Sequence, residues 1–151
     1  MSYRAGNLQS ALTYCVEFAC EMLRQAGEFY PFGAVVARDG EVNALAGWDG
    51  DEHSRAADLY QMLIDELSDN AGQGEIAGAA IAVNVNMPGN LAAKWPDGIR
   101  VRLESAGNAQ LVYVPYRLEP EIWWRRLMGN PRKVVMADPI VLNAQPEVFV
   151  N

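Results

Sequence analysis

The order of the predicted elements constrains this chain more than any single motif. An amphipathic helix near 8–26 leads into a two-stranded hairpin, and a second helix near 54–70 is followed by three strand-like runs. The order α-β-β-α-β-β-β, with a short C-terminal helix and strands, predicts an α+β fold. We expect a central, mostly antiparallel sheet of five or more strands flanked by two main helices. At 151 residues, 1–151 is expected to form a single domain.

Periodicity carries both helix predictions. Apolar residues recur at spacings of three and four from Leu8 to Ala26, with Asn7 as a candidate N-cap and Gly27 as a stop. For the second helix, Ser54 or Asp51 is the predicted cap. Its predicted inward residues are Ala56, Leu59, Tyr60, Leu63, Ile64 and Leu67.

Turn residues and alternation carry the strand predictions. Asp39-Gly40 between two β-prone runs predicts a hairpin in which both turn positions adopt positive φ. The apolar run 79–86 is typical of a central strand, and 99–104 alternates apolar with charged residues. Pro115, inside the run 109–118, predicts an edge position, a bulge or an early strand end.

The C-terminal third carries weaker patterns. Residues 121–128 are predicted to form a short helix, and 133–136 and 147–150 are strand-like. Cys15 and Cys20 lie five apart on one predicted helix, so their side chains point apart and cannot easily form a disulfide. Two reduced thiols are typical of an intracellular protein.

Charge and hydropathy narrow the classes of partner. Twelve basic and nineteen acidic residues give a formal charge of -7, which disfavours nucleic-acid binding. Apolar runs are far shorter than the roughly 20 residues that span a membrane. The N-terminal residues lack the pattern of a signal peptide, so we expect a cytoplasmic protein that binds neither nucleic acid nor membrane.

The densest polar cluster is the predicted loop with Asp49, Asp51, Glu52 and His53, which are weak ligand candidates. Their alternation resembles the start of a calcium loop, but the sixth and twelfth positions would be serine and tyrosine instead of glycine and glutamate. Zinc would need further soft or nitrogen ligands. The pattern favours a solvated acidic loop before a helix N-terminus, with no metal and no cofactor.

Common catalytic motifs are missing from the sequence. His53 is the single histidine, so any Ser-His or Cys-His pair must use it, and there is no G-x-S-x-G. Neither G-x-x-x-x-G-K-[ST] nor G-x-G-x-x-G is present. We therefore assign no catalytic residue.

The run Trp123, Trp124, Arg125 and Arg126 is the candidate partner-binding segment. Adjacent tryptophans point about 100° apart on a helix, and Trp and Arg are enriched at interface hot spots. The alternative is that one indole packs in the core while the other lies beneath an arginine.

Two resemblances accompany these patterns. The run 29–36 with its Asp39-Gly40 turn, the strand 99–104 and the run 112–116 resemble a family of small bacterial proteins of uncharacterised function. The order of elements is similar to the roadblock and profilin-like arrangement, from which 133–151 departs by adding strand-like material. Neither resemblance implies catalytic residues.

Together these patterns predict a non-enzymatic protein-interaction module of adaptor or immunity type, acting through self-association as a homodimer or through another bacterial protein. The alternative is a small enzyme or metal-dependent binder that uses the Asp49–His53 loop.

Overall fold

The computed structural model describes residues 5–46, 55–91, 94–119, 127 and 132–150. In chain order the elements are α1 (Ala5–Ala26), β1 (Phe32–Ala37), β2 (Val42–Ala46), α2 (Ala56–Gly72), β3 (Ile76–Asn86), β4 (Asp97–Ser105), β5 (Asn108–Leu118), β6 (Val134–Met136) and β7 (Ile140–Asn143). The predicted α+β class and the order helix, hairpin, helix and three strands are confirmed. The N-cap predicted at Asn7 is wrong, because α1 begins at Ala5 and the Asn7 side chain donates to the Gly40 carbonyl (2.8 Å).

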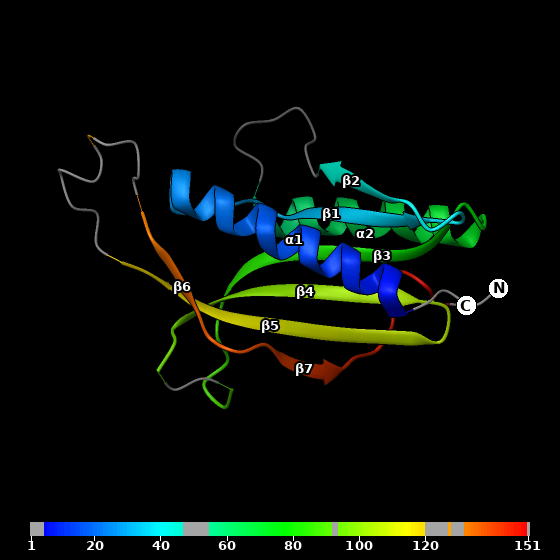
Figure 1. Cartoon of the computed structure of the whole chain (residues 1–151). Coiled ribbons are helices and arrows are strands. Elements are labelled where there is room, and N and C mark those ends of the chain that lie inside the picture. Colours follow the sequence, from blue (N-terminus) through cyan, green and yellow to red (C-terminus); the bar gives the residue numbers. More distant parts are fainter. Residues whose placement is uncertain (1–4, 47–54, 92–93, 120–126, 128–131, 151) are drawn as a thin grey trace.

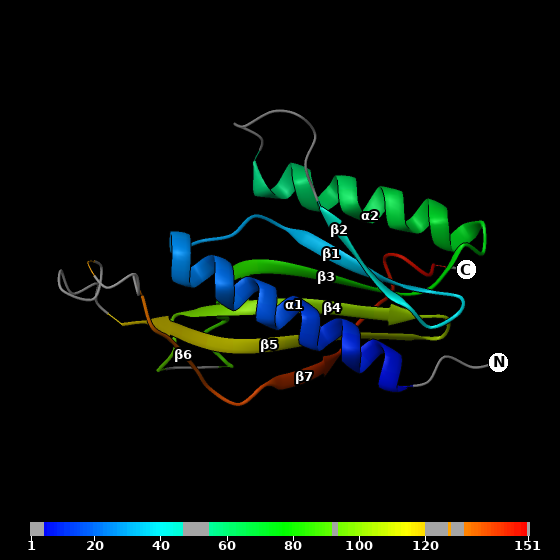
Figure 2. The same ribbon diagram turned by 45° about the horizontal axis from the view of Figure 1, so that its top comes forward.

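One antiparallel sheet organises these elements, in the order β2-β1-β3-β4-β5-β6, with β7 also paired to β5 (Figure 1). The predicted run 79–86 lies in β3, at the centre of the sheet. Figures 1 and 2 show α1 and α2 on opposite faces of the sheet. The two faces are called here the α1 face and the α2 face.

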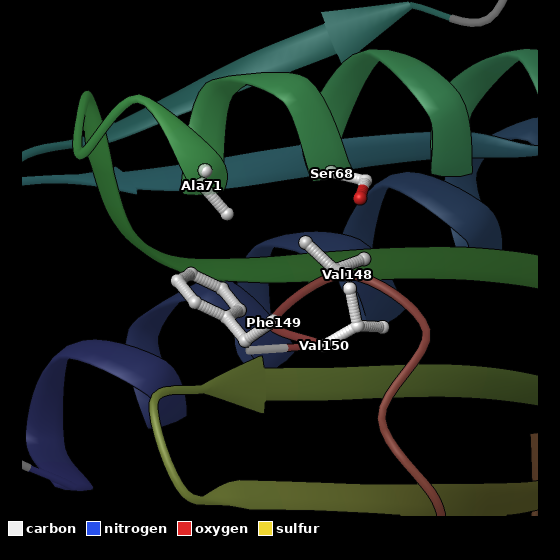
Figure 3. Close-up of a pocket in the computed structure, with 6 residues that line it drawn as sticks. Ser68, Ala71, Val148, Phe149 and Val150 are labelled. Carbon is white, nitrogen blue, oxygen red and sulfur yellow. The ribbon is translucent and has the colours of Figure 1, made fainter.

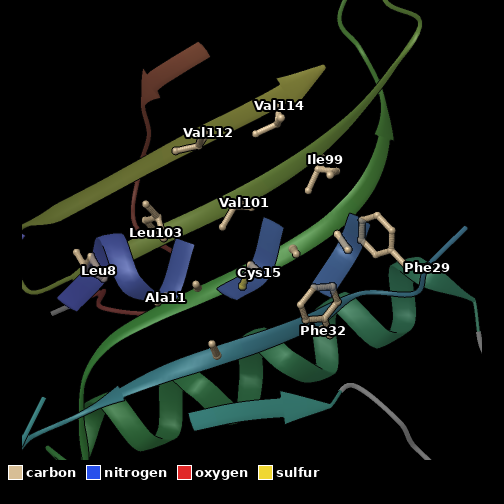
Figure 4. Close-up of a cluster of buried hydrophobic side chains, with 14 of the residues drawn as sticks. Leu8, Ala11, Cys15, Phe29, Phe32, Ile99, Val101, Leu103, Val112 and Val114 are labelled. Atoms are coloured by element: carbon tan, nitrogen blue, oxygen red, sulfur yellow. The ribbon is translucent and has the colours of Figure 1, made fainter. Parts of the chain in front are cut away.

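The α1 face holds the larger apolar core (Figure 4). Side chains on α1 such as Ala11, Cys15 and Leu23 are buried against alternate residues of the strands, because successive side chains of a strand point to opposite faces. Ile99 and Val101 of β4 belong to this core. Burial raises the pKa of the Cys15 thiol to about 12, and Cys15 and Cys20 are both free thiols.

The α2 face holds a second, smaller core. Leu63, Ile64 and Leu67 of α2 pack on Ala79 and Ile81 of β3. Ala56, predicted to point inward, is exposed, because it lies in the first turn of a helix that begins two residues later than expected. The N-cap is Arg55, which has no side-chain capping bond, and the predicted caps Ser54 and Asp51 lie outside the described residues.

The hairpin predicted at Asp39-Gly40 joins β1 to β2, with Val36 opposite Val42. The predicted conformation is wrong at one position, because only Gly40 has positive φ, at 96°. The Gly40 N–H donates to the Ala37 carbonyl (2.9 Å), and the Asp39 carboxylate accepts from the Glu41 N–H (2.9 Å). This pattern is typical of a type I turn closed by a left-handed glycine, which needs one positive φ and not two.

Pro115 lies inside β5, which continues past it to Leu118, so an early strand end is wrong. Its carbonyl accepts from the N–H of Ala137, on the side of β5 away from β4. In an antiparallel sheet the N and C=O of one residue point to the same neighbouring strand. The nitrogen of Pro115 therefore faces the segment between β6 and β7, and not β4. The sheet loses no ladder bond to β4 there.

The C-terminal strands differ in part from expectation. The run 133–136 contains β6, but β7 at 140–143 was not predicted, and 147–150 is not a strand. This last segment follows Pro146 and is bound by side chains instead of by a neighbouring strand. The helix predicted at 121–128 lies outside the described residues except for Leu127, which is 78% exposed.

Candidate protein-binding surface

Both candidate sites predicted from the sequence lie outside the described residues. These are the loop with Asp49, Asp51, Glu52 and His53 and the segment with Trp123, Trp124, Arg125 and Arg126. Within the ranges that the structure describes, no group of three or more His, Cys, Asp or Glu side chains is placed to hold a metal ion. Nor is any helix of these ranges long and apolar enough to cross a membrane.

A buried polar cluster on the α2 face was not predicted as a site. Arg102 and Glu104 alternate with the apolar residues of β4, and this pattern indicates two different faces of the strand. Arg102 is only 8% exposed and Glu104 is fully buried. Arg102 Nη1 donates to Glu104 Oε2 at 2.9 Å and to the Gln145 carbonyl at 2.8 Å.

The Glu104 carboxylate binds the backbone of the C-terminal segment. Oε2 accepts the N–H of Glu147 (2.9 Å), and Oε1 accepts those of Val148 (2.9 Å) and Phe149 (3.0 Å). The Val148 side chain, 1% exposed, completes the smaller apolar core. We call residues 145–150 the C-terminal strap.

Tyr60 of α2 closes the cluster. Its hydroxyl donates to Glu147 Oε1 at 2.6 Å and accepts from Arg102 Nε at 3.2 Å. Burial and the hydrogen bond to Glu147 raise the pKa of Tyr60, while the charge of Arg102 opposes the rise. The guanidinium of Arg100 lies 5.5 Å from the centre of the Tyr60 ring. This polar cluster therefore ties α2, β4 and the strap together.

The polar cluster is suited to structure more than to catalysis. A carboxylate offers about four acceptor positions, and Glu104 receives four N–H donors, one from Arg102 and three from the strap. Its acceptor capacity is used within the fold. Beside it lies a cavity of about 60 Å³ lined by residues of α2 and the strap, including Ser68, Val148 and Phe149 (Figure 3). This volume is far below the roughly 300 Å³ at which ligand pockets begin.

A larger hollow opens on the other side of the sheet, between α1 and the outer strands. It has a volume of about 280 Å³, and we call it the α1–β5 groove. Its lining residues are Gln9, Leu12, Thr13, Val16 and Glu17 of α1, Val112 and Val114 of β5, and Met136, Ala137 and Pro139.

Strand register extends the apolar floor of the groove. Tyr116 pairs with Met136 and Val112 with Val141, and directly opposed residues place their side chains on the same face of a sheet. Met136 and Val141 therefore lie on the α1 face. They are 44% and 55% exposed. Solvent-exposed apolar residues that continue an apolar groove are typical of a surface that binds a partner.

The sequence predicted some of the residues that line this groove, but not the groove itself. Leu12 and Val16 belong to the apolar periodicity of the first helix, and there they predict burial against the sheet. The groove exists because α1 packs mainly on β1, β3 and β4, which leaves β5, β6 and β7 to one side of it (Figure 1). That placement depends on the position of the helix across the sheet, which no local pattern encodes.

Comparisons with known proteins add no relative: no family model, curated protein or solved structure matches the chain. The two resemblances seen in the sequence therefore remain predictions.

Proposed function

We propose that the protein is a non-enzymatic interaction module of adaptor or immunity type, and that it binds another protein chain in the α1–β5 groove. The observation that carries this proposal is the exposed apolar edge of the groove on the α1 face, where Met136 lines the groove and Val141 lies opposite the lining residue Val112. Protein-binding surfaces combine such an apolar centre with a polar rim, and Gln9, Thr13 and Glu17 supply the rim here.

The polar cluster supports the same proposal from the opposite face. Its charged groups are engaged with one another and with the strap, so this cluster serves folding. The alternative, an enzyme or metal-dependent binder using the Asp49–His53 loop, concerns residues outside the described ranges, and no observation favours it. A cytoplasmic location and self-association as a homodimer remain part of the proposal.

Two valines provide a matched test. Val141 and Val150 are each 55% exposed, but Val141 lies on the α1 face beside the groove and Val150 lies in the strap at the α2 face. A photo-crosslinking amino acid is placed at either position in the full chain, in cells of the native host. We expect position 141, and not position 150, to crosslink to one defined protein or to a second copy of the chain.

The crosslinked protein is then purified and its dissociation constant is measured. We expect Val141→Glu to weaken binding by about tenfold or more, as loss of an interface anchor does, and Val150→Glu to leave it unchanged. Equal crosslinking at both positions, no crosslinking at 141, or equal affinity of the two variants would each overturn the proposal.

A further inference from the structure

We propose that the α1–β5 groove receives an amphipathic helix with basic flanks, presented by the partner chain. This inference rests on the proposed function and specifies the class of partner. It is carried by three features of the described residues: the shape of the groove, the charge at its rim and the structure of the neighbouring sheet edge.

The wall of the groove follows one face of a helix. Gln9, Leu12, Thr13, Val16 and Glu17 are spaced i, i+3, i+4, i+7 and i+8 along α1. Eight steps at about 1.5 Å each give a wall about 12 Å long, slightly more than two helical turns. A wall of this length beside a sheet suits a second helix that lies alongside the first and inserts its side chains into the groove.

The width of the sheet leaves space for that helix. Neighbouring strands lie about 4.8 Å apart, so the path of six strands is about 24 Å wide. A helix with its side chains is about 10 Å across. Because α1 packs mainly on β1, β3 and β4, and Val112 and Val114 of β5 are already buried, the added helix would lie over the exposed residues of β6 and β7 on the α1 face.

The negative charge at the rim of the groove favours a partner helix with basic residues beside its apolar stripe. Glu17 is the one charged residue that lines the groove, and the exposed Asp138 lies between the lining residues Ala137 and Pro139. Among the described lining residues none is Lys or Arg. A helix that carries Lys or Arg beside its apolar stripe would therefore complement the rim, and the chain's formal charge of -7 would favour its approach.

The sheet edge beside the groove is poorly suited to the main alternative, an added strand. β7 has four residues and lies between Pro139 and Pro146, and a short edge strand flanked by prolines offers few backbone groups for pairing. The apolar groove along α1 therefore offers a helix more contact surface than this edge offers an added strand.

A peptide library separates these possibilities. Sixteen-residue random peptides are displayed and selected on the full wild-type chain, with removal of every peptide that also binds the Val141→Glu variant. We expect the survivors to place apolar residues at i, i+3, i+4 and i+7 with Lys or Arg beside them. Circular dichroism should show that a synthetic survivor gains helix on binding.

Charge reversal tests the rim. Glu17→Lys should weaken a surviving peptide by about fivefold, whereas Glu66→Lys, an exposed position on α2, should have no effect. This inference would be overturned by surviving peptides that bind as extended strands, that carry acidic flanks, or whose affinity is unchanged by Glu17→Lys. The proposed function would still be supported if the crosslinked partner depends on the groove. If no peptide survives and Val141 variants bind the crosslinked protein normally, both proposals fail.

Discussion

The two faces of the sheet are buried by different means, and β4 contributes to both. On the α1 face its Ile99, Val101 and Leu103 enter an apolar core that needs only shape and volume. On the α2 face its Arg102 and Glu104 are buried because the strap supplies backbone donors and acceptors that match them. One face therefore tolerates approximate packing, and the other depends on specific partners for the Arg102 and Glu104 side chains.

The faces also differ in how completely the chain covers them. On the α2 face the strap lies beside α2, and Val148 fills the space that the helix leaves over the sheet. On the α1 face the corresponding space is the α1–β5 groove, which the described residues leave open. A surface that the chain completes by itself on one face and leaves open on the other supports the groove as a docking surface.

The largest expected effect tests the polar cluster. Glu104→Ala removes the partner of a buried arginine and the acceptor of three N–H groups of the strap, and breaking a buried ion pair costs about 3–5 kcal/mol. The free energy of unfolding, measured in urea, should fall by that amount. Glu104→Gln keeps one acceptor oxygen and should lose less. A loss below about 1 kcal/mol for the alanine variant would show that the stability of the α2 face does not depend on the specific hydrogen bonds of Glu104.

The next effect compares apolar packing on the two faces. Leu23 of α1 and Leu63 of α2 are both fully buried, one in each core. Leu23→Ala and Leu63→Ala should each cost about 2–5 kcal/mol, through lost transfer free energy and the cavity left behind. Urea midpoints with unchanged slopes check both values. If only one variant is destabilised, the opposite core does not contribute to the cooperative fold.

Alkaline pH should weaken the α1 face through two groups. Burial raises the pKa of Cys15 from 9.0 to about 12, and burial with the nearby Asp97 raises that of Tyr116 from 10.0 to about 12, against the hydrogen bond to Asn84. In the unfolded chain these groups lose their protons first, so their contribution is complete below pH 9 and is lost as pH rises to about 12.

Variants isolate that contribution. Cys15→Ala and Tyr116→Phe should each flatten the fall in unfolding free energy between pH 9 and 12, measured by urea unfolding at each pH. A difference from wild type that stays constant across this range would contradict the burial of these groups.

Local patterns were enough to predict most of the fold, and the failures share one cause. The helix periodicity of α1, the Asp39-Gly40 turn and the alternation in β4 each lie within a few residues. The burial of Glu104, in contrast, depends on N–H groups 43 to 45 positions away. The alternation of β4 indicates two different faces, but it does not distinguish solvent from a strap as the partner of the charged one.

The C-terminal third shows the same limit. Residues 147–150 have strand-like composition, but the Glu104 carboxylate takes the N–H groups that a ladder would use. β7 was missed because its four residues between two prolines form a pattern too short to stand out. The groove could not be predicted, since it results from where α1 crosses the sheet. The two sites predicted from composition remain untested, because they lie outside the described residues.

The smallest expected effect concerns the two exposed valines, and it decides whether the binding test is interpretable. Val141→Glu and Val150→Glu replace side chains that are already half in solvent, so each should change the free energy of unfolding by at most about 1 kcal/mol. Val141 lies in an edge strand, where glutamate is less favourable, so its change should be the larger of the two. Urea midpoints measure both. With stabilities this close, a loss of partner binding confined to Val141→Glu reports on the α1 face itself. If Val141→Glu instead unfolds the chain, Val141 supports the fold, and the contrast between a completed α2 face and an open α1 face is wrong at that position.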